Sequence, residues 1–144
     1  MSTTYEIKSD TFKYIESEIY SHSENKKEID RLRLAILNPT KPSDENIVYG
    51  PLEKGLPVRT TEVMATRLLT NKMLRNLEEM VEAVEYVYNR LSDDRKKVIE
   101  LKYWNKDRKL KMEQIASECH MHRNTVSSIR RNFVKAVAMH VGMK

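Results

Sequence analysis

Apolar positions recur every three or four residues along most of the chain, which is the spacing of one face of an α-helix. Over residues 10–37 this stripe is interrupted in its middle, near residues 21–23, by the polar His22, Ser23 and Lys26. The pattern fits either one long helix with a weak centre or two helices that meet there, and Pro39 ends it, because the residue before a proline disfavours helical backbone. The apolar positions of the stripe are Phe12, Ile15, Ile19, Ile29, Leu32 and Ile36.

The next stretch, residues 39–59, differs from its surroundings in composition. It holds all four prolines and two of the three glycines of the chain. These residues favour turns and loops, so the stretch is interpreted as a linker or an ordered loop. A loop of about twenty residues is long enough to indicate either a functional or a disordered segment.

A second long helix is expected over residues 60–91. Thr60 or Thr61 would cap it, and Glu62 would lie in its first turn, where an acidic side chain is favourable. A helix cannot bury its apolar stripe alone, so this one must pack on the first helical stretch, on a second copy of the chain, or on both. The stripe alternates steps of four and three, as in a coiled coil, through Met73, Leu77, Met80, Val84, Val87 and Leu91.

Residues 92–144 read as three short helices. Ser92 is a suitable N-cap, and the acidic Asp93 and Asp94 follow it at the helix start. In the second and third helices, a small residue is expected where the two axes cross, with a larger apolar side chain filling the turn between them. This layout predicts a helix-turn-helix. Its expected core is Ile115, Ala116, Met121, Val126, Ile129 and Phe133.

The predicted fold is therefore all-α, with two long helices joined by the Pro/Gly-containing loop and followed by this three-helix module. The predicted segments are 1–38, a helical arm; 39–59, the linker; 60–91, the central helix; and 92–144, the helix-turn-helix domain.

Positive charge is concentrated at the C-terminal end of the chain. Residues 1–90 carry 13 Lys/Arg and 15 Asp/Glu, a balance of −2, whereas residues 91–144 carry 13 and 6, a balance of +7. No acidic residue follows Glu118. A basic end on a near-neutral body indicates a polyanionic partner, although a solvated basic face would give the same balance.

The last helix has a polar side opposite its apolar stripe, and this side is the expected DNA-reading face. Asn can pair with adenine and Arg with guanine in the major groove, while cations at the helix starts suit phosphates. Arg130 lies nearer the inner face and is expected either to have a structural role or to contact a flanking phosphate. The candidates for base edges are Asn124, Ser127, Ser128 and Arg131, and those for phosphates are Lys109, Lys111, Arg123 and Lys135.

Other kinds of site have little support in the sequence. Cys119, His120 and His122 lie too close together, and with too few thiols, for a structural zinc site, so neither a metal nor a cofactor is expected. The chain lacks the Gly-rich phosphate loops and the catalytic motifs of enzymes, and a single cysteine excludes an internal disulfide. Without an apolar run long enough for a membrane span, it is expected in the cytoplasm.

The segment 91–137 resembles the region-4-type helix-turn-helix of bacterial sigma factors. The whole chain resembles the RinA family of phage transcriptional regulators, related to the ArpU group, in its length, its 38–47 block, its central helix and its C-terminal module. The resemblance implies an activator of phage late operons, which encode packaging and structural proteins, in Gram-positive hosts. The residues that match the sigma-type module are Leu91, Val98, Leu101, Tyr103, Ile115, Ala116, Thr125 and Val126.

The chain departs from the family pattern at a few positions. Val48 and Tyr49 precede Gly50 where the family tends to have more glycines. His122 stands where a serine usually caps the last helix, and because imidazole is a poorer cap than a hydroxyl, this helix start is expected to be looser. Cys119 and Met121 replace Leu and Val, a conservative change in a core.

The sequence thus predicts an activator that binds double-stranded DNA, works with host RNA polymerase in the host bacterial cytoplasm, and has no enzymatic activity. Self-association through the 60–91 helix is left open. Two alternatives remain at this point: a DNA-packaging protein like a small terminase subunit, and a helical interaction protein that does not bind DNA.

Overall fold

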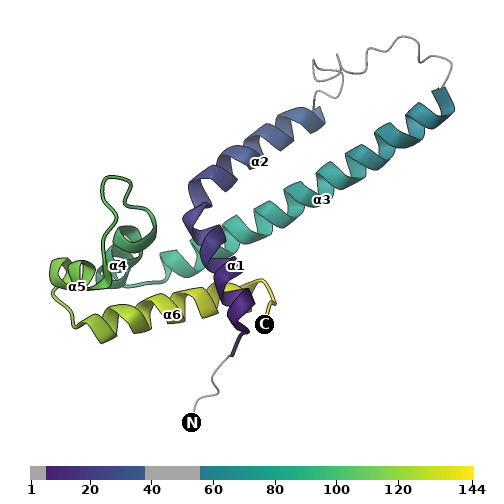
Figure 1. Ribbon diagram of the computed structural model, residues 1–144. Coiled ribbons are helices and arrows are strands. Elements are labelled where there is room, and N and C mark those ends of the chain that lie inside the picture. The colour runs from purple at the N-terminus through teal and green to yellow at the C-terminus, as the bar shows by residue number, and fades with distance from the viewer. Residues whose placement is uncertain (1–5, 38–55) are drawn as a thin grey trace. The chain divides into compact units, whose positions relative to one another are not determined.

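The computed structural model describes residues 6–37 and 56–144, and the regular secondary structure of this part is all helical, with no strand (Figure 1). The all-α prediction is therefore confirmed for the described residues. Most of the predicted 39–59 loop lies outside them. The helices are α1 (Ser9–Tyr20), α2 (His22–Leu37), α3 (Leu56–Asn89), α4 (Asp93–Tyr103), α5 (Met112–Cys119) and α6 (Arg123–His140).

The first helical stretch is divided in two, which decides between the alternatives left open by its sequence. α1 ends at Tyr20, and Ser21 has φ −90° and ψ 12°, outside the regular helix. Its N–H still bonds to the carbonyl of Ser17 at 3.1 Å. His22 then begins α2, with its ring 5.5 Å from that of Trp104. The polar residues in the middle of the stripe thus mark a real break.

The central helix begins earlier than predicted. The expected start was Thr60 or Thr61, but α3 already begins at Leu56, so the predicted caps were wrong. Pro57 does not prevent this start, because a proline in the first turn has no N–H that an intrahelical bond would need. At the other end α3 stops at Asn89, and Ser92 is the N-cap of α4 without a side-chain capping bond.

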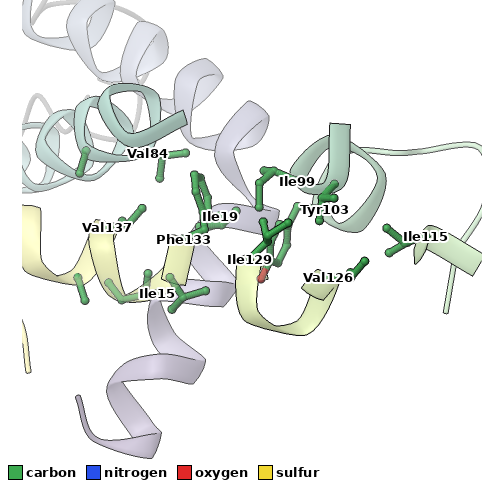
Figure 2. Close-up of a cluster of buried hydrophobic side chains, with 14 of the residues drawn as sticks. Ile15, Ile19, Val84, Ile99, Tyr103, Ile115, Val126, Ile129, Phe133 and Val137 are labelled. Atoms are coloured by element: carbon green, nitrogen blue, oxygen red, sulfur yellow. The ribbon is translucent and has the colours of Figure 1, made fainter. Parts of the chain in front are cut away.

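The described chain divides into two compact units, of which the first contains residues up to Ser23 together with 79–144. In it α4, α5 and α6 contact one another in all three pairings, and α1 packs on α6. Figure 2 shows how side chains from α1, α3, α4, α5 and α6 interdigitate in one apolar core. Its labelled members are Ile15, Ile19, Val84, Ile99, Tyr103, Ile115, Val126, Ile129, Phe133 and Val137.

The second unit comprises residues 24–78, that is most of α2 and the first part of α3. Ile29 and Leu32 of α2 are buried. Arg33 of α2 donates to the carboxylate of Glu78 on α3 at 2.7 Å, so the two helices run beside each other in this unit (Figure 1).

The predicted seam of α3 does not form one continuous buried stripe. Met80 and Val84 are buried in the core of the first unit, whereas Met73 is 45% exposed. The predicted helical period is correct, but the two halves of α3 have different surroundings. None of the described helices combines the length and the apolar character needed to cross a membrane.

Candidate nucleic-acid interface

The predicted core residues between α5 and α6 are buried together. Ile115 and Val126 are fully buried, Ala116 is 6% exposed and Phe133 2% exposed. Ile129 is also buried, and Met121 is half-buried against the same cluster. With its inner side covered in this way, α6 turns its other side to solvent.

The turn from α5 to α6 consists of only three residues, 120–122. His120 adopts the left-handed conformation, with φ 55° and ψ 46°. The N–H of Met121 then reaches back to the carbonyl of Ala116 at 2.9 Å, which satisfies an acceptor at the end of α5 as in a Schellman motif. The sharp turn therefore places a non-glycine residue, His120, in the left-handed region of backbone conformation. Histidine adopts this conformation more readily than most residues.

His122 caps α6, contrary to the expectation of a looser helix start. Its Nδ1 accepts a hydrogen bond from the backbone N–H of Asn124 at 3.0 Å. This bond requires Nδ1 to be unprotonated and satisfies one of the open N–H groups of the first turn. An imidazole here serves the function that a serine hydroxyl would otherwise have.

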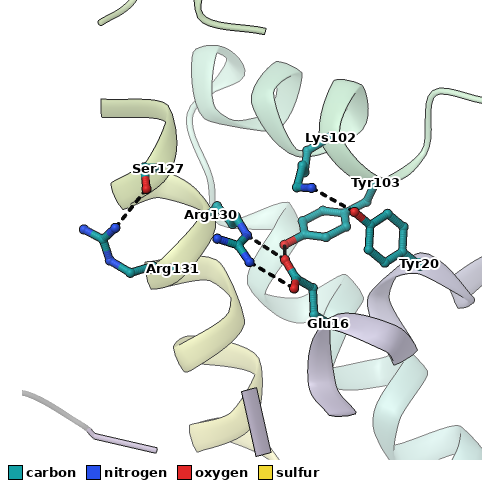
Figure 3. Close-up of polar contacts among 7 residues, drawn as sticks. All are labelled: Glu16, Tyr20, Lys102, Tyr103, Ser127, Arg130 and Arg131. Atoms are coloured by element: carbon teal, nitrogen blue, oxygen red, sulfur yellow. Dashed lines mark hydrogen bonds and ion pairs between the residues drawn. The ribbon is translucent and has the colours of Figure 1, made fainter. Parts of the chain in front are cut away.

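The candidate base-reading residues lie on the side of α6 that faces away from the core. Asn124 and Arg131 are exposed, while Ser127 and Ser128 are half-buried. The guanidinium of Arg131 donates to Ser127 Oγ at 2.9 Å (Figure 3) and to Ser128 Oγ at 3.3 Å. These bonds lay the arginine along the helix surface, so it must exchange them for a base edge if it reads DNA.

The candidate phosphate-binding residues differ in their surroundings. Lys109 and Lys111 are exposed and have no ion-pair partner among the described residues. Arg123 lies 3.5 Å from Glu113, and Lys135 lies 4.0 Å from Glu6. The two lysines are thus available at once, whereas the other two cations have exposed acidic neighbours that a phosphate would displace.

The start of α5 has two exposed lysines, Lys109 and Lys111, beside the acidic Glu113 of its first turn. Lys111 is its N-cap, and its backbone N–H donates to Gln114 Oε1 at 2.8 Å. The positive end of the helix dipole lies at this terminus. Backbone N–H groups and lysine side chains near such a terminus favour a phosphate.

A polar network that the sequence did not reveal ties α1 to the middle of α6. Arg130 binds Glu16 with both arms, Nε to Oε2 at 2.6 Å and Nη2 to Oε1 at 3.1 Å (Figure 3). Tyr103 of α4 donates to the same Oε2 at 2.6 Å. The partners are 114 and 87 residues apart in sequence, so no local pattern could have paired them. Glu16 is therefore the partner through which Arg130 would have the structural role expected for it.

The network shifts the ionisation of its members. Burial disfavours the ionised Glu16 carboxyl, but the hydrogen bonds from Arg130 and Tyr103 outweigh burial and lower its pKa from the ordinary 4.5. The pKa of Arg130 is raised, chiefly by its hydrogen bonds to Glu16. Burial, together with the bond to Glu16, raises the pKa of Tyr103. All three groups therefore keep their charge states at neutral pH, and the network holds one arrangement.

The cations around α5 do not all face solvent freely. Arg108 pairs with Glu118 at 2.9 Å, and Lys97 donates to the backbone carbonyl of Glu118 at 3.2 Å.

Burial raises the pKa of the neighbouring Cys119 thiol, which disfavours the reactive thiolate. Among the residues that the structure describes, no three His, Cys, Asp or Glu side chains converge in a way that could hold a metal ion.

Comparison with known proteins adds two similarities to this geometry. The model of a family described as "Protein of unknown function (DUF722)" matches residues 9–139. The chain is also similar to the "Transcriptional activator rinA" of Staphylococcus phage phi11, with 26% identity over 140 residues, which cover 96% of this chain and 95% of that protein. No solved structure matches the chain.

Proposed function

The chain belongs to the family described as "Protein of unknown function (DUF722)", and from this membership and its similarity to a phage transcriptional activator we propose that it activates transcription of phage late genes by binding a specific DNA site. The similarity extends over nearly the whole chain and agrees with the RinA-like character expected from the sequence. The late operon for packaging and structural proteins is the proposed target.

The outer side of α6 is the observation that carries the proposal. This helix has no acidic residue, buries its apolar stripe, and exposes short polar side chains followed by a cation. A helix of this kind can enter the major groove without repelling the phosphates. We therefore propose that α5 and α6 form a helix-turn-helix like that of sigma region 4, with α6 as the recognition helix.

Each candidate residue has a distinct role in this proposal. Asn124 and Arg131 would read base edges, with Ser127 and Ser128 completing the contact surface and holding Arg131 before DNA binds. Lys109, Lys111, Arg123 and Lys135 would bind phosphates and set the register on the duplex.

The proposed partner in transcription is host RNA polymerase in the bacterial cytoplasm. The proposed recognition helix is accompanied by no second module, among the described residues, that we interpret as promoter-opening, so the protein would assist a holoenzyme rather than replace its sigma factor. We propose no enzymatic activity and no cofactor for it.

A reconstituted transcription assay tests this function. A template carrying the upstream region of the late operon is transcribed by host RNA polymerase holoenzyme with and without the protein, and DNA binding is measured on the same fragment. Activation that depends on the fragment supports the proposal. Site-specific binding without any rise in transcript would contradict the activator role and favour a packaging protein instead, while the absence of binding would reject both.

The matched variants for this assay are Arg131→Ala and Lys27→Ala. Each removes one positive charge from an exposed position, but Lys27 lies on α2 and outside the proposed interface. Activation should be lost with the first variant and kept with the second.

A further inference from the structure

Exposed apolar side chains gather in the second unit, residues 24–78. Eight of the twelve large hydrophobic side chains that are exposed in the described part of the chain belong to it. An exposed apolar patch of this kind marks an interaction surface. Five of the eight lie on the first half of α3, namely Val63, Met64, Leu68, Leu69 and Met73.

Four of these side chains cover one side of α3, which we name the α3 outer face: Met64, Leu68, Leu69 and Met73. Their exposed fractions are 57%, 70%, 59% and 45%. With 3.6 residues per turn, they spread over about half of the helix circumference. On the other half, Thr70, Leu74 and Leu77 are half-buried, so the internal packing of the chain uses that side and leaves the outer face available to a partner.

The sequence of the outer face reads alike in both directions. A reversal about the point between Leu68 and Leu69 exchanges these two leucines with each other and exchanges Met64 with Met73. A surface with this property can meet a copy of itself in antiparallel orientation, with like apolar side chains opposite each other. An isologous two-fold contact has this self-complementarity.

The polar residues beside the apolar ones obey the same reversal. It places Glu62 opposite Arg75, a carboxylate against a guanidinium, and Ala65 opposite Lys72, a small side chain against a long aliphatic stem. Glu62 and Arg75 are exposed and have no ion-pair partner within the described chain. A parallel pair would instead bring Glu62 against Glu62 and Arg75 against Arg75, which is repulsive.

We propose that the α3 outer face binds a second copy of this chain, antiparallel, with the two-fold axis passing between Leu68 and Leu69 and a Glu62–Arg75 ion pair at each end. This contact uses the first half of α3, whereas the second half, with Met80 and Val84, is occupied in the core of each chain.

The size of the face is sufficient for a dimer of modest affinity. A large aliphatic side chain removes about 60–120 Å² from water on burial, so the eight side chains of two copies would bury about 500–1,000 Å² of apolar surface. Apolar atoms make up roughly 56–65% of such interfaces. The total approaches the lower part of the range of about 1,200–2,000 Å² for specific complexes, and the dimer should dissociate at micromolar concentrations.

Sedimentation velocity of the full chain without DNA tests the contact directly, over about 1–100 µM. A monomer–dimer equilibrium is expected. Leu68→Glu should weaken it at least about tenfold, and Met139→Glu is the matched control, since Met139 is 53% exposed on α6 and lies outside the face. A wild-type protein that remains monomeric at every concentration, with the helix content expected from circular dichroism, overturns the proposal.

Charge reversal tests the antiparallel register. Glu62→Arg alone and Arg75→Glu alone should each weaken the dimer about tenfold, because each creates two like-charge contacts. The double variant should restore the dissociation constant to within about threefold of the wild type. A double variant as weak as, or weaker than, the single variants would contradict the register.

This proposal is independent of the DNA-binding function, because it is measured without DNA. If the proposed function also holds, a two-fold dimer predicts an operator with inverted half-sites. A monomer that binds DNA specifically would overturn the dimer alone, and a dimer that binds no DNA would overturn the proposed function alone.

Discussion

Glu16 and Arg130 form a bidentate ion pair between the first and last helices of the first unit, with distances of 2.6 and 3.1 Å. Arg130 directly precedes the proposed base-reading Arg131, so the pair fixes the rotation of α6 about its axis. The side chains of the pair are largely covered, at 15% exposure for Glu16 and 29% for Arg130. α1 is thereby a structural part of the proposed DNA-binding unit.

Removing the carboxylate should destabilise this unit. Glu16→Ala leaves a partly buried guanidinium without its partner, and we expect the free energy of unfolding to fall by about 2 kcal/mol. Urea denaturation at neutral pH measures the change. Ser17→Ala, on the exposed side of the same helix, is the control and should change stability by less than about 0.5 kcal/mol. Equal effects of the two substitutions would mean that the ion pair contributes nothing.

The same pair predicts an acid limb in the stability profile. Because the pKa of Glu16 in the folded chain is lower than its ordinary 4.5, the pair contributes stability at pH values above 4.5, and the contribution disappears as pH falls through the folded pKa. The difference in unfolding free energy between wild type and Glu16→Gln should therefore shrink below about pH 4.5. A difference that stays constant from neutral pH to about pH 3 would argue against an ionised Glu16 as its source.

Two substitutions should separate base reading from phosphate binding. Arg131→Ala should cost about 1–3 kcal/mol in binding to the specific site and relax specificity there. Lys111→Ala should weaken specific and scrambled duplexes alike and reduce the slope of log affinity against log salt by about one. Fluorescence anisotropy with both duplexes at several salt concentrations distinguishes the two patterns. If neither substitution changes binding, the recognition face is misplaced.

The His122 cap can be tested by changing its acceptor. His122→Ala removes the acceptor for the Asn124 N–H and should destabilise the fold by about 0.5–2 kcal/mol. His122→Ser supplies a hydroxyl acceptor and should keep or raise the melting temperature. Thermal unfolding of the three proteins decides the matter, and an alanine variant as stable as wild type would show that water caps the helix equally well.

The left-handed His120 makes a sharp prediction for the turn. His120→Gly relieves a conformation that costs an L-residue about 1–2 kcal/mol, although the greater freedom of glycine in the unfolded chain offsets about 0.5–1 kcal/mol of that gain. Its stability should be equal to or above that of wild type. His120→Val places a β-branched residue at positive φ and should be clearly less stable. Urea denaturation compares them, and a valine variant as stable as the glycine variant would exclude a left-handed residue 120 in solution.

Periodicity was sufficient to predict the helices, because each helix buries one stripe of its own sequence. Ile115 and Val126, expected in a common core, are both fully buried. Helix ends are harder to predict: Pro57 belongs to the predicted 39–59 loop, yet it falls within the first turn of α3. The spacing of apolar residues also predicted the helical period of α3. It did not show that Met80 would be buried and Met73 exposed.

The polar contacts could not be predicted, because they depend on residues distant in sequence. Glu16 has no distinguishing neighbours in the chain, and only the packing of α1 on α6 brings it to Arg130. The cap by His122 was missed for a different reason, since the preference for hydroxyl and carboxyl caps is statistical, while the geometry of this turn lets an imidazole nitrogen reach the same N–H.

A salt titration of DNA binding tests whether α6 recognises a specific site. The wild-type protein is titrated onto a duplex from the upstream region of the late operon and onto a scrambled duplex of equal length and composition, from about 50 to 200 mM salt. We expect markedly tighter binding to the operon duplex, with the affinity for both duplexes falling steeply as salt rises. Equal affinity for the two duplexes at every salt concentration would contradict a site-specific recognition helix and leave α6 as a basic surface only.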